Sequence, residues 1–518
     1  MQDIARGVRA FTLGTAVSRV LGLVREMVFA HLFGSSRSTD AFNAAFRIPN
    51  LLRDLFAETS LSAAFVPVLT EEKGKGKERQ NLLASNILNT LLLVVGTITI
   101  LGMIFHRPVA SLVAMGFSRI PEKLALTSSL TFITFPFLLF VSLAAWAMSY
   151  HNTEGSFFIP SVAPAFFNVF SIAVPVAMFG WYTARGGDPI FGAALGVTVG
   201  GLMQLLVQVP GVFRRGYRYL FYLNWHDPQF RKVMALFIPV AIGLAGSRIN
   251  VFVNTILVSY LAERSMTWLN YAYRIMHLPL GLFGMAVGTV ALPRFSRLVL
   301  DRKNEELKSS LKDSLKMVFF LTVPSSILIA FFAQPITRLI YQRGHFTAED
   351  TAAVSQALIL YTLGIPFISA LRNVASVFYA HQDARAPMYA SFASIGLNIV
   401  MNLALMKPLG FLAFPLSASV ASVVNIYLLL RWLPRKIGEV NFSPVYGYFL
   451  KLAVVSAAAG LAGYFGFRLL TPAFGPMFLP MLSLTLICGT TSLLIFYFGC
   501  RLLRIKEVDS YLRRFLRK

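Results

Sequence analysis

The chain has 518 residues, of which 56% are hydrophobic and 14% charged, and its mean hydropathy of +0.65 excludes an ordinary soluble protein. The net charge of +24 does not indicate nucleic acid binding, because the basic residues gather in alternate loops and form no basic-aromatic motif. Cys488 and Cys500 are the only cysteines; they would lie about 18 Å apart along one helix, so we expect no disulfide. These properties predict a multi-pass membrane protein.

Apolar segments long enough to cross the roughly 30 Å hydrocarbon layer recur along the whole chain. They lie at about 8–33, 40–69, 82–105, 124–150, 157–181, 190–213, 230–262, 266–292, 314–341, 351–380, 386–407, 411–433, 447–470 and 477–503. We therefore predict an all-α protein with about 14 transmembrane helices. The charged first, second, seventh and eighth spans should score poorly on hydropathy alone. Residues 294–316, which alternate charge with leucine, favour either an amphipathic interfacial helix or a solvated linker.

Positive charge is concentrated in every second loop, as in residues 71–81, 214–231 and 294–316. The opposite loops hold few basic residues, and Lys123 is one of them. Cytoplasmic loops carry the excess of lysine and arginine in membrane proteins. The pattern therefore predicts that both termini are cytoplasmic, as an even number of spans requires.

An internal repeat organises these spans. Gly14-Thr-Ala-Val-Ser-Arg19 recurs as Gly243-Leu-Ala-Gly-Ser-Arg248, and Asn43-Ala-Ala-Phe-Arg-Ile48 recurs as Asn270-Tyr-Ala-Tyr-Arg-Ile275. The repeat implies two halves of six helices each. Because six is even, both halves begin on the same side of the membrane, so they are parallel repeats related by an axis along the membrane normal. We predict an N-lobe at 1–228, a C-lobe at 229–440, and two further helices with a basic cytoplasmic tail at 441–518.

The first two spans carry polar residues at spacings of three or four, which places them on one face of each helix. The second span has Asp40, Asn43, Arg47, Asn50, Asp54 and Glu58, and the first has Thr12, Thr15, Arg19, Gly22 and Glu26, with Arg25 and Arg53 just off these stripes. Each charge at the bilayer centre costs about 2.5 to 3.5 kcal/mol. We therefore expect both stripes to face a hydrated or charged cavity; the alternative is that ion pairs fix the helix contacts.

Arginine at this density suits an anion such as phosphate or pyrophosphate, which accepts several forked hydrogen bonds. The predicted substrate-binding residues are Arg19, Arg25, Arg47, Arg53, Arg248 and Arg274. Four acids, namely Glu26, Asp40, Asp54 and Glu58, would hold the arginines while the site is empty or form a gate. The seven histidines are scattered without ligand spacing, so no metal site is predicted. Nucleotide-binding and hydrolase motifs are absent from the sequence.

Several motifs resemble those of the MurJ (MviN) lipid II flippases of the multidrug/oligosaccharidyl-lipid/polysaccharide exporter superfamily. They include Ser18-Arg-Val-Leu-Gly-Leu-Val-Arg25, Thr39-Asp-Ala-Phe42, Pro49-Asn-Leu-Leu-Arg53 and Tyr271-Ala-Tyr-Arg-Ile275. The resemblance implies two six-helix lobes plus two helices, and export of lipid II to the outer leaflet of a bacterial cytoplasmic membrane by alternating access. It implies functional roles for Arg19, Arg25, Asp40, Arg53, Glu58 and Arg274.

The resemblance also implies a transporter and not an enzyme, without a cofactor. Lipid II and membrane lipids are the expected partners of a monomer, and cell-wall synthesis proteins are candidates. Some family members bind sodium through acids on spans 7 and 11; these spans here offer Asn250, Asn254, Asn398 and Asn402 instead. The membrane potential acting on the arginines or a cation gradient remain as driving forces.

Three alternatives stay open. A flippase for another polyprenyl-linked saccharide would use the same arginines. A cation-coupled drug exporter is disfavoured, because such a site would prefer unpaired acids and aromatic residues. A polyprenyl-phosphate membrane enzyme needs carboxylates for metal binding or base catalysis, and the sequence has no Asp-x-Asp cluster.

Overall fold

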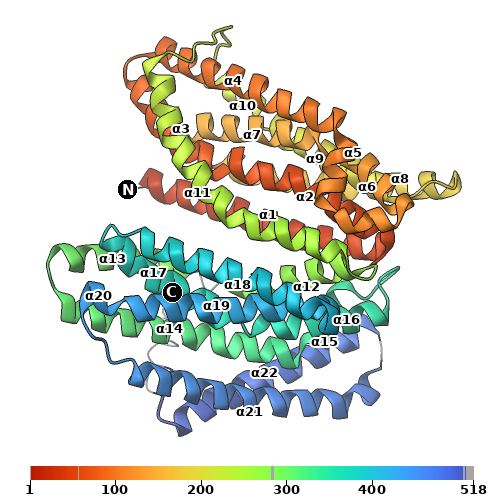
Figure 1. Ribbon diagram of the computed structural model, residues 1–518, viewed down its shortest axis with the longest axis vertical. Helices are drawn as coiled ribbons and strands as arrows, with labels where there is room; N and C mark the ends of the chain where they lie inside the picture. The colour runs from red at the N-terminus through yellow and green to blue at the C-terminus, as the bar shows by residue number, and fades with distance from the viewer. Residues whose placement is uncertain (1, 57, 282–284, 476, 506–507, 509–518) are drawn as a thin grey trace. The chain divides into compact units, whose positions relative to one another are not determined.

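The computed structural model describes residues 2–56, 58–281, 285–475, 477–505 and 508, and within these ranges it describes the side chains outside 2–13, 58–60, 244–247 and 285–290. The described part is helical and contains no strand. It forms two compact units (Figure 1): unit 1 comprises residues 1–267 and 343–346, and unit 2 comprises 268–342 and 347–518.

Unit 1 is built from long helices that pack side by side. In chain order they are α1 (Gln2–Phe33), α2 (Arg37–Phe56), α3 (Glu58–Gly74), α4 (Lys77–Ile104), α5 (His106–Val113), the 3-10 helix η1 (Met115–Arg119), α6 (Pro121–Thr134), α7 (Pro136–Thr153), α8 (Phe158–Ala184), α9 (Ile190–Leu206), α10 (Val209–Arg214) and α11 (Pro228–Ser259). The apolar core includes Phe65, Leu130, Phe137 and Leu138. Helix α7 lies at its centre and packs against α3, α4 and α9.

Small residues allow α1 to lie directly on α8. A Cβ atom at Gly14 would overlap the side chain of Ser161, and Gly22 lies opposite Asn168. The side-chain amide of Asn168 donates a hydrogen bond of 3.0 Å to the backbone carbonyl of Ser18. The glycines therefore fix which face of α1 is buried, and so fix where the arginines of α1 point.

The connections of unit 1 gather at two ends of the helix bundle. At one end the ammonium groups of Lys73 and Lys77, on either side of the α3–α4 turn, lie 3.0 and 2.9 Å from the carboxylate of Glu154. At the other end Ser38 hydrogen-bonds Asp188. The turn between α1 and α2 therefore lies beside the turn between α8 and α9.

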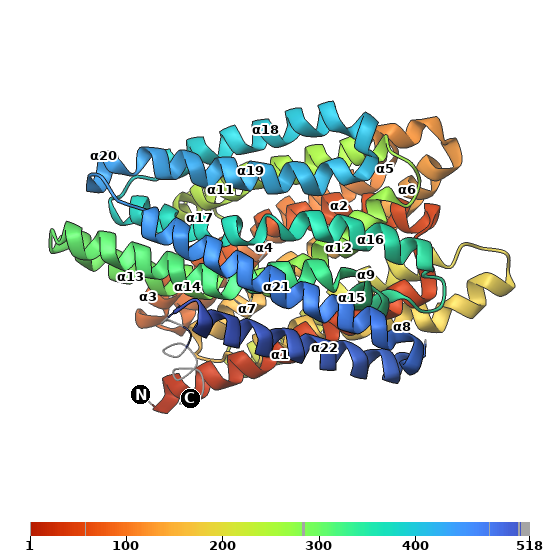
Figure 2. The ribbon, with the colours of Figure 1, turned by 90° about the horizontal axis from the view of Figure 1, so that it is seen from below.

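Unit 2 repeats this helical construction. Its helices are α12 (Ser265–Pro279, whose first three residues belong to unit 1), α13 (Met285–Leu300), α14 (Asn304–Phe331), α15 (Ala333–Tyr341), α16 (Ala348–Thr362), α17 (Ile365–Ala380), α18 (Arg385–Leu409), η3 (Gly410–Leu412), α19 (Ala413–Trp432), α20 (Pro434–Ile437), α21 (Ser443–Phe474) and α22 (Phe478–Leu502). Figure 2 shows α21 running beside α22, and α14 packs on α21 and α17. Helices α21 and α22 are the two spans that follow the predicted repeat.

All fourteen predicted spans coincide with helices. In the described part of the chain, nine helical segments are long and apolar enough to cross a membrane, or ten if the bent α11 counts as one span. The first, second and eighth spans are not among the nine, and the seventh qualifies only as that bent pair. The low hydropathy expected for these charged spans stays a prediction.

One detail differs from the prediction. The prediction of an interfacial helix or linker at 294–316 is wrong: α13 runs to Leu300, and Leu307, Leu311 and Leu315 of α14 are buried in the core of unit 2. Unit 1 extends to residue 267, because α11 packs on α2 and α3. The lobe boundary at residue 229 rests on the repeat and stays a prediction.

Candidate functional site

An arginine and an acid form a pair on α1. The Nη2 and Nε atoms of Arg25 lie 2.7 and 3.1 Å from the Oε1 atom of Glu26. The guanidinium also lies over the ring of Phe167 from α8, at 5.3 Å from the ring centroid. Glu26 is buried and Arg25 is partly open to solvent. The carboxylate therefore holds Arg25 from the protein side while a face of the guanidinium stays accessible.

A second cluster joins α2 to α11. One carboxylate oxygen of Asp54 lies 3.1 Å from Nη2 of Arg53, and the other lies 3.0 Å from Nη2 of Arg248. One carboxylate between two guanidinium groups leaves one positive charge in excess. The side chains of Arg53 and Arg248 are 31% and 40% exposed, so the protein leaves this charge partly uncovered. The cluster is chemically suited to an anion, which would accept hydrogen bonds from both guanidinium groups.

Three further arginines belong to the predicted set. Arg19 is exposed on α1 and makes no hydrogen bond or ion pair with any residue that the structure describes. Arg47 is half-buried on α2. Arg274 is exposed on α12 and belongs to unit 2. The structure thus brings together Arg53, Asp54 and Arg248, and it pairs Arg25 with Glu26; the side chain of Glu58 lies outside the described residues.

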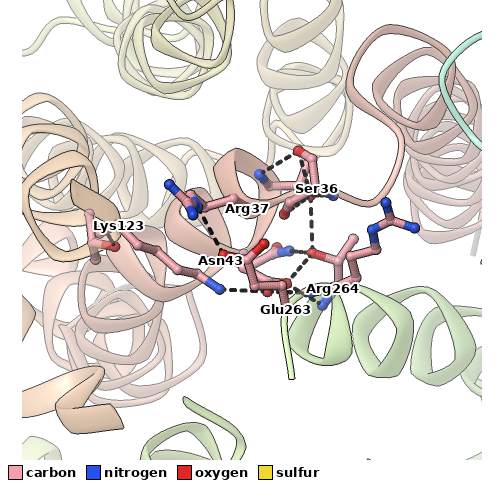
Figure 3. Close-up of polar contacts among 10 residues, drawn as sticks. Ser36, Arg37, Asn43, Lys123, Glu263 and Arg264 are labelled. Carbon is pink, nitrogen blue, oxygen red and sulfur yellow. Dashed lines mark hydrogen bonds and ion pairs between the residues drawn. The ribbon is translucent and has the colours of Figure 1, made fainter. Parts of the chain in front are cut away.

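Asp40 departs from its predicted role of holding an arginine. It is 1% exposed, and its Oδ2 atom accepts hydrogen bonds from the ammonium of Lys123 at 2.9 Å and the backbone N–H of Arg264 at 2.7 Å. Its Oδ1 atom accepts from the backbone N–H and hydroxyl of Thr267, at 3.0 and 2.7 Å. Figure 3 shows this network between the α2, α6 and α11–α12 segments. Asp40 is an ion-pair residue as predicted, but its partner is a lysine.

Lys123 is the residue that the sequence analysis missed, because it was counted among the sparse charges of an outer loop. It is 2% exposed, near the start of α6, with its ammonium 4.1 Å from the ring centroid of Phe117. On the same helix Thr127, Thr131 and Thr134 are buried. A charged lysine within a membrane protein is costly unless an acid lies nearby, as for the arginines. Lys123 together with the threonines that follow it was therefore a signal in the sequence for a buried ion pair.

The expectation that both polar stripes face a hydrated cavity therefore needs correction. Asp40 and Glu26 are buried, and Asn43 donates its amide hydrogen to the hydroxyl of Thr267 at 3.2 Å. These groups stabilise helix contacts, whereas Arg19, Arg53 and Arg248 keep accessible surface. The stripes are mixed: the acidic side chains are mostly buried in the protein, and the arginine side chains keep exposed surface.

The chemistry available to this arrangement is anion binding. Among the residues that the structure describes, no group of three or more histidine, cysteine or acidic side chains is placed to hold a metal ion. The arginines provide fixed positive charge and forked donors, which match the geometry of phosphate and pyrophosphate oxygens.

The family model and the most similar relatives all carry the same family name. The family model "Lipid II flippase MurJ" matches residues 29–485. The probable lipid II flippase MurJ of Haemophilus influenzae is 34% identical over 468 residues, covering 87% of this chain and 90% of the relative. The lipid II flippase MurJ of Burkholderia cenocepacia is 34% identical over 454 residues, covering 87% of each chain.

A comparison with solved structures finds the same family. A lipid II flippase MurJ in the inward closed conformation superimposes with a TM-score of 0.76 at 29% identity, covering 95% of this chain and 99% of the other. An inward-facing multidrug resistance MATE transporter of the MOP superfamily reaches a TM-score of 0.62 at 15% identity, covering 81% and 94%, which shows a shared fold alone. The resemblance seen in the sequence motifs is confirmed, and the chain belongs to the MurJ family of lipid II flippases.

Proposed function

We propose that this protein is a lipid II flippase. It moves the polyprenyl-pyrophosphate-linked saccharide-peptide precursor of peptidoglycan from the inner to the outer leaflet of the bacterial cytoplasmic membrane. The observation that carries the proposal is the family match over residues 29–485, with relatives that align along most of their own length. The protein makes and breaks no covalent bond in this cycle, and it is a transporter.

The arginine clusters supply a mechanism for head-group capture. With no substrate present, Glu26 holds Arg25, and Asp54 holds Arg53 and Arg248. A pyrophosphate carries more negative oxygens than one carboxylate, so it competes for the same guanidinium groups and satisfies both forks of each. In the proposed cycle Arg25 and Arg53 of unit 1 and Arg274 of unit 2 grip the pyrophosphate, and alternating access carries it across.

The remaining features of the proposal follow from topology and charge. Both termini lie in the cytoplasm, and the protein acts as a monomer among membrane lipids, with cell-wall synthesis proteins as candidate partners and no nucleic acid. The driving force is the membrane potential acting on the arginines or a cation gradient. Imposing each gradient separately on proteoliposomes that contain the purified protein distinguishes the two, because only the true driving force should accelerate lipid II translocation.

Replacing Arg25 by Ala tests the function. In cells depleted of the native protein, we expect wild type to restore outward-accessible lipid II and Arg25→Ala to leave the precursor on the inner leaflet. The control is Arg185→Ala, because Arg185 is exposed in the α8–α9 turn and lies over Trp181. Both variants should be extracted as folded protein with similar unfolding temperatures. Full transport by Arg25→Ala would refute the role of this arginine, and lipid II that reaches the outer leaflet without any flippase would refute the function.

A further inference from the structure

Unit 2 contains a cavity that none of the residues assigned above lines. It has a volume of about 320 Å³ and lies between α13, α17, α18 and α19. It arises because α17 packs on α13, α14 and α19, and α18 packs along α19, while α17 and α18 hardly touch each other. Small-molecule sites begin at about 300 Å³, so the cavity is large enough for a part of a ligand.

Arg372 of α17 gives this cavity a positive charge. Its side chain is exposed, and it makes no ion pair with any residue in the described part of the chain. Arg25 and Arg53, by contrast, each have a carboxylate partner. An arginine within the helices of a membrane protein is costly unless water or an anion compensates it. The cavity therefore offers a cation whose charge the described protein leaves uncompensated.

Other side chains that line the cavity offer unused hydrogen-bonding capacity. Asn425 of α19 is only 7% exposed, yet its side-chain oxygen has no hydrogen-bond partner. Buried polar groups are almost always hydrogen-bonded, so such a group calls for an explanation. The hydroxyl of Ser376 donates to the backbone carbonyl of Arg372 at 2.8 Å, which leaves its oxygen free to accept. Tyr379, whose hydroxyl can donate a hydrogen bond, also lines the cavity.

The walls therefore offer two kinds of partner. Arg372 and Tyr379 are donors, while Ser376 and Asn425 present acceptor oxygens. A phosphate diester carries acceptors alone and would leave the oxygens of Ser376 and Asn425 unsatisfied. A peptide carries both a carboxylate, which matches the guanidinium, and backbone N–H groups, which match the two oxygens.

We propose that this cavity binds the carboxylate-bearing peptide of the transported head group, with the carboxylate on Arg372 and a peptide N–H on Asn425. The inference rests on the proposed lipid II flippase function and assigns to unit 2 a recognition site for the peptide, separate from the capture of pyrophosphate. It makes the protein selective for precursors that carry the peptide over those that lack it.

The test compares two probes on the full-length protein in phosphatidylcholine nanodiscs. The probes are lipid II and a counterpart that has neither the peptide nor the sugar carboxyl group to which the peptide is attached, undecaprenyl-pyrophosphate-chitobiose. We expect wild type to bind lipid II about tenfold or more tightly than the peptide-free lipid, as one charge-assisted hydrogen bond allows. Arg372→Gln should bring the ratio of the two affinities close to one, with the affinity for the peptide-free lipid unchanged.

Two further variants sharpen the comparison. Arg431→Gln also removes one exposed arginine from unit 2, but Arg431 does not line the cavity, so it should keep the ratio of wild type. Asn425→Leu preserves the size of the side chain and removes its polar atoms, so it should lower the ratio without destabilising the fold. An unfolding temperature for each variant separates loss of selectivity from loss of structure.

The outcomes separate the two proposals. An unchanged ratio in Arg372→Gln, or an equal loss of affinity for both probes, would overturn the peptide site while leaving the flippase function standing. A wild-type preference that disappears when phosphatidylethanolamine replaces phosphatidylcholine would identify a phospholipid head group as the occupant, and would also overturn it. Wild-type protein that binds neither probe would contradict the flippase function itself.

Discussion

At the scale of single residues, the Lys123–Asp40 pair is a buried contact that should be sensitive to substitution. Both side chains are 2% exposed, and the carboxylate has four hydrogen-bond donors around it. Removing one partner of such a pair leaves a buried charge without compensation, which costs about 3 to 5 kcal/mol. The pair therefore fixes the α11–α12 turn against α2 and α6.

We expect Lys123→Met to lower the unfolding free energy of the detergent-solubilised protein by this amount, because Asp40 stays buried without its cation. The double variant Lys123→Met with Asp40→Asn should recover part of the loss, since the uncompensated charge is gone. Arg37→Gln is the control: Arg37 pairs with Glu122 and Glu263 at the surface, where ion pairs contribute little. A Lys123→Met protein as stable as wild type would contradict a structural role for the pair.

Glu154 predicts how stability depends on pH. Burial raises the pKa of this carboxyl, but hydrogen bonds from Lys77, Gln80 and Lys73 outweigh burial and hold the pKa below its usual value near 4.5. A carboxyl with a depressed pKa stabilises the fold above its unfolded-state pKa, and the stabilisation is lost as the pH falls through the folded-state value. Unfolding temperatures should therefore drop on acidification below about pH 4.5.

Glu154→Gln isolates this contribution. The variant should unfold at a lower temperature than wild type at pH 7, and the difference between the two proteins should shrink below about pH 4.5. Glu78→Gln, a change of an exposed glutamate nearby on α4, should leave the profile unchanged. A Glu154→Gln protein whose deficit persists at low pH would show that packing, and not ionisation, causes the loss.

The candidate site shows what residue spacing can and cannot predict. The sequence placed Arg53, Asp54 and Arg248 among the site residues, and the structure brings these three together. Spacing also put Asp40 on the same helical stripe as Asp54, but it says nothing about which neighbouring helix each turn of α2 meets. Asp40 meets α6, which supplies Lys123, so its partner was predicted wrongly.

At the scale of whole elements, close backbone contact between η1 and α11 orders one end of unit 1. The backbone N–H of Gly116 donates to the hydroxyl of Ser259 at 2.8 Å, and a Cβ atom at Gly116 would overlap the backbone of Ser259 and Tyr260. Backbone atoms cannot move aside as a flexible side chain can. The glycine is therefore required for η1 to lie against the end of α11.

We expect Gly116→Ala to destabilise the protein by about 1 to 3 kcal/mol, the usual cost of overpacking, as measured by the shift in unfolding temperature. Gly96→Ala is the matched control, because nothing lies within 4 Å of a Cβ atom placed there on α4. Alanine is favoured over glycine inside a helix, so the control should be as stable as wild type or slightly more stable. Equal behaviour of the two variants would contradict the close contact.

Element positions were predictable, but interruptions within elements were not. Hydropathy locates a span because about twenty apolar residues are needed to cross the membrane, and all fourteen segments are helical. The interruption between α6 and α7 leaves apolar residues on both sides, so the hydropathy pattern continues across it. For Leu307, Leu311 and Leu315 the amphipathic pattern was correct, but the buried partner was unit 2 and not the membrane surface.

At the scale of the whole molecule, the loops of unit 1 meet at two opposite ends, in agreement with the alternation of basic and weakly charged loops in the sequence. Lys73, Lys77 and Glu154 meet at one end, where Lys232 also pairs with Glu71. The Lys232–Glu71 pair joins two loops that the sequence assigned to the basic set, and the Lys73 and Lys77 pairs join one of these loops to the α7–α8 connection. The turns after α1 and α8 meet at the other end, through Ser38 and Asp188. Within unit 2, Lys436 likewise pairs with Asp383 at 2.8 Å, joining two loops of the basic set.

Cysteine labelling tests which end faces the cytoplasm. Cys488 and Cys500 are buried, and replacing both by Ser gives a background without thiols. On that background, Lys75→Cys in the α3–α4 turn and Arg185→Cys in the α8–α9 turn place one exposed thiol at each end of unit 1. With a membrane-impermeant maleimide on spheroplasts, we expect Arg185→Cys to react at once and Lys75→Cys only after permeabilisation.

The physical reason is the retention of lysine and arginine on the cytoplasmic side during insertion, which acts over short loops such as these. Inside-out vesicles provide the converse control, in which Lys75→Cys should react and Arg185→Cys should be protected. A reversed result would invert the orientation, and the proposed capture of lipid II from the inner leaflet would fail with it. Reaction of both thiols from one side would contradict the alternation of the loops, because α4, α6 with α7, and α8 would then not cross the membrane in turn.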